Sequence, residues 1–307
     1  MKTIISKLII LALLVIIPYL IIGVNIEDSY KLKRDYLESQ LNQVEVLSMG
    51  SSHGQSINPA YFSLKGFNLS NPSQDLYYDV HLANKYIDKM PELKLLIIPI
   101  SYFSFESQLD NSPENSRLFP YLITWGIPPE NFSAFLNDNF LLFVDAEVKN
   151  FVQNGFVNNA TPKMDQDGWM QLSGALQDSP SFYDTYDKQG QERVKFQDSS
   201  MYPEQIPENM KILSNLIEDC QSRQIKIVLI TTPGLHFYYD HMDPIRYQRM
   251  QDNLNSLKVR YEIPYFNYLK DPRFVPSDFA NQDHLNTKGA EKFSKILDVE
   301  IIKKLTE

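Results

Sequence analysis

Two long apolar runs constrain the fold of this chain more than any other feature. LKLLIIPIS (93–101) and IKIVLITT (225–232) are nearly continuous apolar runs, with polar residues only near their ends. A strand that is apolar on both faces must be covered on both, as in the parallel sheets of α/β proteins. Weaker strand candidates lie at 44–49, 66–70 and 264–269, and helical spacing of apolar residues appears over 75–90, 207–222 and 287–305. This alternation predicts a doubly wound, flavodoxin-like parallel sheet of five strands.

The connection between the third and fourth strands is much longer than a crossover requires. Its central part, about residues 106–200, holds both tryptophans, Trp125 and Trp169, and many other aromatic residues. We expect an insertion that covers the carboxyl ends of the strands, where open α/β sheets bind ligands. We expect its aromatic residues to form a small core of their own, and a substrate platform is the alternative.

The N-terminus carries a membrane signal. LIILALLVIIPYLIIGV (8–24) has no charged residue and follows Lys2 and Lys7. At about 1.5 Å per residue, a helix of this length just crosses a hydrocarbon core. A signal peptide is the alternative, but no A-x-A-like cleavage site follows. The sequence therefore predicts a single-pass anchor over 1–26, a linker over 27–40, and a domain over 41–307. We expect that domain outside the cytoplasmic membrane, in the periplasm or at the cell surface.

Composition excludes several classes of function. A formal net charge of −9 and a pI near 5.1 argue against a nucleic-acid partner, which would require clustered Lys and Arg. The single cysteine, Cys220, excludes an intrachain disulfide and lies on the apolar face of a predicted helix. His236 and His241 lack the H-E-x-x-H pattern of a zinc site. We expect neither a metal nor another cofactor.

The motif GSSHG (50–54) comes directly after the first predicted strand. It matches the G-x-S-x-G nucleophile elbow of α/β-hydrolases, but in that fold several strands and a glycine-rich loop precede the serine. Ser52 is either a nucleophile or the N-cap of the next helix. We expect the neighbouring His53 to face elsewhere and to have a structural role.

A polar loop near the C-terminus contains the candidate base. In FANQDHLNTKGAEKF (279–293), His284 lies just before the last helix, for which Thr287 is a plausible N-cap. In a doubly wound sheet this loop returns to the edge where the first strand ends, so Ser52 and His284 are expected to meet. Asp283 could orient the imidazole, and Asn281 lies three residues upstream. The alternative is a loop histidine that bonds its neighbours.

These two motifs together resemble the SGNH/GDSL hydrolase superfamily over most of the chain beyond residue 40. Gly50-Ser51-Ser52 corresponds to its first block, Gly-Asp-Ser, which implies that Ser52 is the nucleophile. His284-Leu285-Asn286 corresponds to its last block. The family's Asp three residues before the histidine is Asn281 here, so either Asp283 has taken the orienting role or a dyad suffices.

The resemblance also implies an oxyanion hole, with departures from the family pattern. The second block, Asn-x-Gly-x-x-Gly, appears as NLSNPS (68–73), so a backbone N–H of Ser73 stands where the family has glycine. The third block's asparagine is absent, and Ser101 or Tyr102 takes its place. The implied donors are the N–H groups of Ser52 and Ser73, with Ser101 assisting.

Within the superfamily, the chain looks most like membrane-anchored, extracytoplasmic members, such as alginate O-acetylation proteins and the D-alanyl-lipoteichoic acid biosynthesis protein. That resemblance implies serine-dependent transfer of an acyl group, in most cases acetyl, to or from a polysaccharide through an acyl-serine. It also implies a membrane-bound O-acyltransferase as partner. Two alternatives remain: a simple carboxylesterase or lipase, and a non-catalytic member of such a complex.

Overall fold

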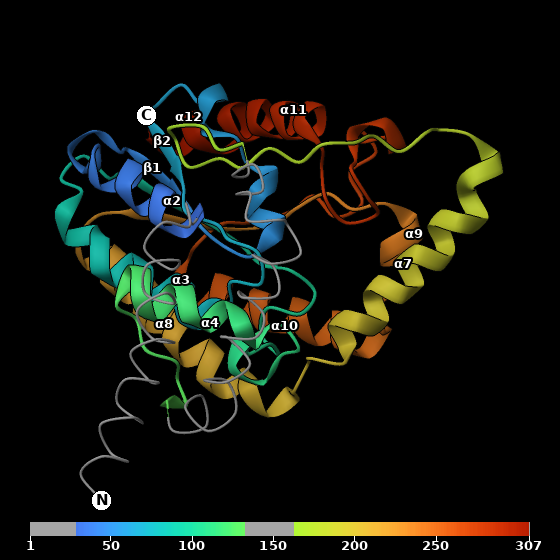
Figure 1. The fold of residues 1–307 in the computed structure, drawn as a ribbon. Coiled ribbons are helices and arrows are strands. Elements are labelled where there is room, and N and C mark those ends of the chain that lie inside the picture. Colours follow the sequence, from blue (N-terminus) through green and yellow to red (C-terminus); the bar gives the residue numbers. More distant parts are fainter. Residues whose placement is uncertain (1–28, 133–162, 307) are drawn as a thin grey trace, which may run out of the picture.

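The computed structural model describes residues 29–132 and 163–306 (Figure 1). The predicted membrane anchor over 8–24 lies outside these residues. Among the helices of the two described ranges, none has the length and apolar character needed to cross a membrane.

A parallel sheet of five strands forms the centre of the molecule, in the order β2-β1-β3-β4-β5. The strands are β1 (Val46–Ser48), β2 (Gly66–Asn68), β3 (Leu95–Pro99), β4 (Lys226–Thr231) and β5 (Tyr265–Asn267). All five predicted strands are confirmed, and so is the flavodoxin-like order. Because β1 pairs with both β2 and β3, the loop after β1 lies where the strand order reverses.

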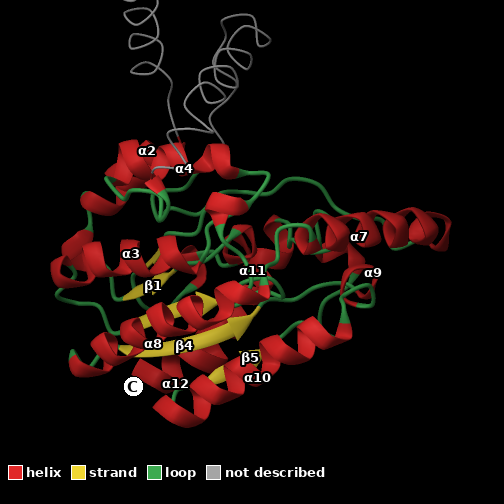
Figure 2. Cartoon of the chain, turned by 90° about the horizontal axis from the view of Figure 1, so that it is seen from below, coloured by secondary structure: helices red, strands yellow, loops and turns green. Residues whose placement is uncertain are grey.

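Helices cover both faces of the sheet (Figures 1 and 2). One face carries α3 (Leu76–Tyr86), α8 (Ile206–Ser222) and α10 (Pro244–Tyr261). The other carries α11 (Thr287–Leu297), a π-helical turn (Asp298–Ile302) and α12 (Lys303–Thr306).

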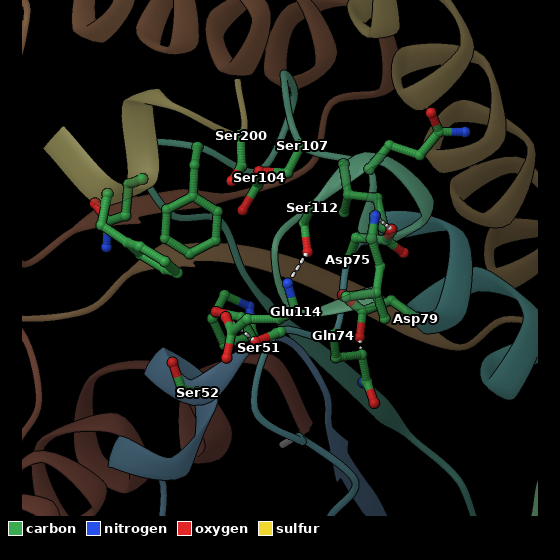
Figure 3. Close-up of a pocket in the computed structure, with 18 of the residues that line it drawn as sticks. Ser51, Ser52, Gln74, Asp75, Asp79, Ser104, Ser107, Ser112, Glu114 and Ser200 are labelled. Atoms are coloured by element: carbon green, nitrogen blue, oxygen red, sulfur yellow. Dashed lines mark hydrogen bonds between the residues drawn. The ribbon is translucent and has the colours of Figure 1, made fainter. Parts of the chain in front are cut away.

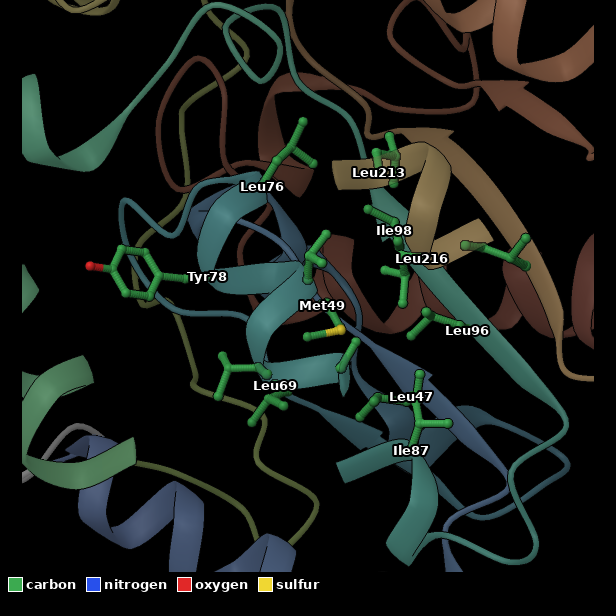
Figure 4. Close-up of a cluster of buried hydrophobic side chains, with 14 of the residues drawn as sticks. Leu47, Met49, Leu69, Leu76, Tyr78, Ile87, Leu96, Ile98, Leu213 and Leu216 are labelled. Carbon is green, nitrogen blue, oxygen red and sulfur yellow. The ribbon is translucent and has the colours of Figure 1, made fainter. Parts of the chain in front are cut away.

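Successive residues of β3 point to opposite faces, which explains the continuous apolar run in the sequence. Leu96 and Ile98 pack under α3 and α8 (Figure 4), whereas Leu95 and Ile97 pack under α11. Cys220 is fully buried on the first of these faces, as its helical position predicted.

The remaining α-helices are short, apart from α7 in the insertion. They are α2 (Ser29–Glu38), α4 (Leu118–Pro120), α7 (Tyr183–Asp198) and α9 (His236–Tyr239). Only the 3-10 turns Ser52–Ser56 and Pro59–Tyr61 connect β1 to β2.

Two expectations from the sequence need correction. Residues 29–38, expected to be linker, form α2, because Tyr30 and Leu37 lie on one face of this helix and join the main core. Tyr121 and Trp125, expected in a separate small core of the insertion, also belong to the main core. Phe140 and Phe143 of the insertion lie outside the described residues.

Candidate active site

The loop after β1 presents Ser52 at the carboxyl edge of the sheet. Gly50 adopts a left-handed backbone with φ +115°, which favours glycine, and a Cβ there would lie 3.2 Å from Pro99. Ser51, rather than Ser52, caps the following 3-10 turn, since its hydroxyl accepts a hydrogen bond from the His53 N–H. The capping role that rivalled catalysis is therefore filled by the neighbour, and the Ser52 hydroxyl remains available.

The structure brings Ser52 and His284 together from opposite ends of the domain. Ser52 Oγ lies 2.8 Å from His284 Nε2. The loop that holds His284 ends at α11, whose N-cap is Asn286, one residue before the predicted Thr287. Asn286 is the better cap because its side chain accepts from the Gly289 N–H while also bonding the loop carbonyl of Ser277.

Asn281 fixes the tautomer of His284. Its Oδ1 accepts hydrogen bonds from the backbone N–H groups of Asp283 and His284, at 3.2 and 3.0 Å. An atom that accepts from two N–H donors is the amide oxygen, so His284 Nδ1, at 3.0 Å, must donate its hydrogen to it. In the neutral ring, Nε2 then accepts from the Ser52 hydroxyl, which is the arrangement a general base requires.

Asp283 supplies negative charge next to the same imidazole. Its Oδ1 lies 2.8 Å from His284 Nδ1, although the Nδ1 hydrogen is directed at Asn281. The side chain is 1% exposed, and burial alone would raise its pKa. The neighbouring imidazole of His284, the hydrogen bond from His53 and the charge of Arg193 outweigh that effect, so the pKa of Asp283 lies well below its ordinary value. This carboxylate is ionised and can stabilise an imidazolium.

His53 lies inside the site rather than facing elsewhere. Its Nε2 is 3.1 Å from Asp283 Oδ2, and its Nδ1 is 2.8 Å from Ser101 Oγ. The carboxylate can only accept, so Nε2 carries the hydrogen and Nδ1 accepts from the Ser101 hydroxyl. Burial lowers the pKa of His53, which favours this neutral form. The structural role expected for His53 fits this arrangement, although its position was predicted wrongly.

Two residues that line the cavity, Ser52 and Ser73, supply candidate oxyanion donors. Among the described residues, neither the Ser52 nor the Ser73 N–H has a hydrogen-bond acceptor, and both residues line the cavity. Ser73 has φ +59°, the left-handed conformation for which glycine is preferred. Its backbone therefore adopts a conformation that glycine takes without strain. Ser101 does not join these donors, because its hydroxyl is bonded to His53 and it is 3% exposed.

A buried carboxyl group braces the loops that carry these two donors. Asp79 Oδ1 accepts from the Gly50 N–H at 2.8 Å and from Gln74 Nε2 at 2.6 Å. Burial raises the pKa of Asp79 to about 7, because its hydrogen-bond donors are neutral and compensate only in part. Sequence analysis missed this residue. Its position three residues after Leu76, on the apolar face of the predicted helix, was the available signal.

The cavity beside Ser52 is small, with a volume of about 70 Å³ (Figure 3). Its lining mixes apolar side chains, among them Phe103, Leu109 and Phe196, with serine hydroxyls and carboxyl groups. The hydroxyls and carboxyl groups include those of Ser104, Ser107, Ser112 and Ser200, and Asp75, Asp79 and Glu114. The described parts of the insertion thus contribute to the lining of the cavity at the carboxyl edge of the sheet.

The hydrogen-bond network accounts for the ring nitrogens of both histidines. His53, Asp283 and His284 place potential metal-ligating atoms within 4.8 Å of one another. His284 Nε2 faces Ser52, however, and His53 Nε2 faces Asp283. These contacts occupy the ring nitrogens of both histidines and Asp283 Oδ2.

No protein-family model matches the chain, and no curated protein matches it in sequence. Two solved structures resemble it in fold. A candidate acylhydrolase from Bacteroides fragilis has a TM-score of 0.42 and 11% identity, covering 89% of this chain and 96% of its own. A GDSL-like lipase from Bacteroides thetaiotaomicron has a TM-score of 0.41 and 10% identity, covering 90% and 98%. Likeness at this level does not assign an activity.

Proposed function

We propose that this chain is a serine-dependent acyl-transferring enzyme that acts through an acyl-Ser52 intermediate. The observation that carries this proposal is the 2.8 Å contact between Ser52 Oγ and His284 Nε2. Two unpartnered backbone N–H groups beside it, within the described residues, are suited to hold an oxyanion.

The reaction follows from this geometry. Ser52 Oγ attacks an ester carbonyl while its proton passes to His284 Nε2. The N–H groups of Ser52 and Ser73 hold the resulting oxyanion, and Asp283 stabilises the imidazolium. His284 then protonates the leaving alkoxide, which departs and leaves the acyl-serine. An incoming hydroxyl gives its proton to His284 as it attacks the acyl carbon. The bond between the acyl carbon and Ser52 Oγ then breaks, and His284 returns the proton to Ser52 Oγ.

The cavity favours a short acyl group on a polyhydroxylated substrate. Its volume of about 70 Å³ is small beside the roughly 300–1,000 Å³ of sites for drug-sized ligands. Its apolar side chains are suited to contact a short acyl group, and its serine hydroxyls and carboxyl groups are suited to bond sugar hydroxyls. We therefore favour an acetylated polysaccharide over a lipid.

The proposal also includes the location of the reaction and the source of the acyl group. If residues 8–24 anchor the chain, the catalytic domain would meet its polysaccharide outside the cytoplasmic membrane. A membrane-bound O-acyltransferase could then supply the acyl group from the other side. A reporter fused to the C-terminus, active only outside the cytoplasm, tests this placement, and an inactive reporter would exclude it.

The decisive experiment compares the full-length chain with Ser52→Ala. We expect wild type to hydrolyse p-nitrophenyl acetate, to react with a fluorophosphonate at Ser52, and to prefer acetate over palmitate esters. Ser52→Ala should lose both reactions, with hydrolysis reduced by about 10³-fold or more. Equal labelling and turnover in the variant would exclude Ser52 as nucleophile. An inert wild-type chain would support the non-catalytic alternative.

A second experiment separates transferase from esterase. Acetylated and unacetylated oligosaccharides are offered together, and acetyl movement between them is followed by mass spectrometry. Transfer to the second sugar supports the polysaccharide acyltransferase, whereas release of acetate alone supports a simple carboxylesterase.

A further inference from the structure

The two oxygens of Asp283 have different surroundings. Oδ2 lies within hydrogen-bond distance of three donors: Arg193 Nε at 2.7 Å, His53 Nε2 at 3.1 Å and Gln197 Nε2 at 3.2 Å. Oδ1 has no hydrogen bond among the described residues and lies 2.8 Å from His284 Nδ1. Three fixed donors on one oxygen leave the carboxylate little freedom to rotate, so the other oxygen stays directed at His284.

Two of these donors come from the insertion. Arg193 and Gln197 lie one turn apart on α7, and Tyr238 OH donates to Gln197 Oε1. Helix α7 is itself held closely against α9, because a Cβ at Gly190 would lie only 1.6 Å from the carbonyl oxygen of Phe237. The insertion therefore contributes a rigid support to the base as well as a wall of the cavity.

The third donor comes from the nucleophile loop. His53 follows Ser52 directly, and Ser101, at the end of β3, fixes its ring from the other side. Its ring also lies close to that of His284, with centroids 5.0 Å apart. Any displacement of His53 would therefore disturb both Asp283 and the base.

We propose that Arg193 and His53 are positioning residues, which act through Asp283 to keep a negative oxygen beside His284 Nδ1. This inference rests on the proposed function, since it assumes that His284 becomes an imidazolium during turnover. It assigns the insertion a direct part in the chemistry, beyond covering the site.

Arg193 also lines the cavity beside Ser52, so direct substrate binding is the role that an experiment must separate. Hydrolysis of p-nitrophenyl acetate is measured for wild type, Arg193→Met, Asp283→Asn and the double variant. Lys195→Met, an exposed cation on the same helix, is the matched control. If Arg193→Met does not fold, Arg193→Lys replaces it in this double-mutant cycle. Lysine keeps the positive charge but lacks the planar guanidinium group.

We expect Arg193→Met to lower kcat by about 10- to 100-fold, with KM changed by less than about threefold, since a misplaced group acts on the chemical step. In the Asp283→Asn background, Arg193→Met should lower kcat by less than about twofold, because the carboxylate that Arg193 positions is absent. Lys195→Met should behave as wild type. His53→Phe should reproduce the pattern of Arg193→Met.

A loss of the same size in both backgrounds, or a rise in KM alone, would overturn the inference and make Arg193 a substrate-binding residue. A wild-type rate in Arg193→Met would also overturn the inference. In either case, hydrolysis by wild type that is lost in Ser52→Ala would still support the proposed function. No Ser52-dependent activity in wild type would remove the proposed function itself.

Discussion

The two sides of the candidate site hold buried aspartates with opposite properties. On the base side, which comprises His284, Asn281 and Asp283, the carboxyl pKa lies well below its ordinary value. On the oxyanion side, which comprises Ser73, Gln74 and Asp79, the carboxyl pKa is raised to about 7. Asp283 and Asp79 are each 2% exposed, so burial does not account for the difference.

The charge of the partners accounts for it. Asp283 faces Arg193 and a protonatable imidazole, whereas Asp79 is bonded by a backbone N–H and an amide and lies near a second carboxyl group, that of Asp75. A carboxylate near cations stays ionised, and a carboxyl group among neutral donors gains a proton at moderate pH. The base side is therefore built to hold charge during turnover, and the oxyanion side is built to hold a backbone shape.

The largest expected effect separates the two sides by the same substitution. Asp283→Asn removes the charge that stabilises the imidazolium, so kcat should fall by about 10² to 10⁴-fold. Asp79→Asn keeps an acceptor for the Gly50 N–H and should cost far less. Steady-state hydrolysis of a short-chain ester measures both. Equal losses of kcat in the two variants would show that the charge of Asp283 is no more important for turnover than the carboxyl group of Asp79.

The sequence predicted the meeting of Ser52 and His284 because topology alone brings it about. Parallel strands buried on both faces appear as continuous apolar runs, and the order of the elements then fixes which loops share an edge. The strands at 93–101 and 225–232 and the last helix were sufficient for that inference.

The supporting contacts of the site were not predictable in the same way. Arg193 and Gln197 lie in an insertion whose path over the sheet follows from tertiary packing, and nothing in their local sequence links them to Asp283. The question left open between Asn281 and Asp283 also had no answer in the sequence. The structure places both at His284 Nδ1, one through a hydrogen bond and the other as a nearby charge.

The next effect concerns stability and pH on the oxyanion side. Asp79 has a pKa of about 7 in the folded chain and an ordinary value of 3.8. Between these values the folded state retains a proton that the unfolded state has released, so stability falls as pH rises and levels off above about 7.

Asp79→Asn cannot titrate and should lose this contribution. The difference in unfolding free energy between wild type and variant should change by on the order of 2–4 kcal/mol between pH 4 and 7.5, favouring wild type at the acidic end. Urea unfolding at several pH values measures it. A constant difference would mean that Asp79 remains ionised throughout.

A smaller effect tests how the base side divides its two tasks. Asn281→Ala removes the acceptor that fixes the His284 tautomer but leaves the Asp283 charge 2.8 Å from Nδ1. In this variant the Nδ1–H group can donate to Asp283 Oδ1 instead. We therefore expect kcat to fall only about tenfold, much less than in Asp283→Asn. Kinetics of the two variants at matched pH give the comparison. A larger loss in Asn281→Ala would assign the main role to the amide.

The smallest effect concerns the backbone donor of the oxyanion side. Ser73→Ala and Ser73→Gly both lose the hydroxyl, which donates to Glu114 at 2.5 Å, and both keep the N–H. Only glycine adopts φ +59° without strain, so Ser73→Gly should be more stable than Ser73→Ala by about 1 kcal/mol. Because the donor is backbone, both variants should hydrolyse esters within about threefold of wild type. Thermal unfolding and ester kinetics measure the pair. A loss of activity in both variants would mean that the Ser73 hydroxyl, and not its N–H, contacts the substrate. The oxyanion side would then act through a side chain, as the base side does.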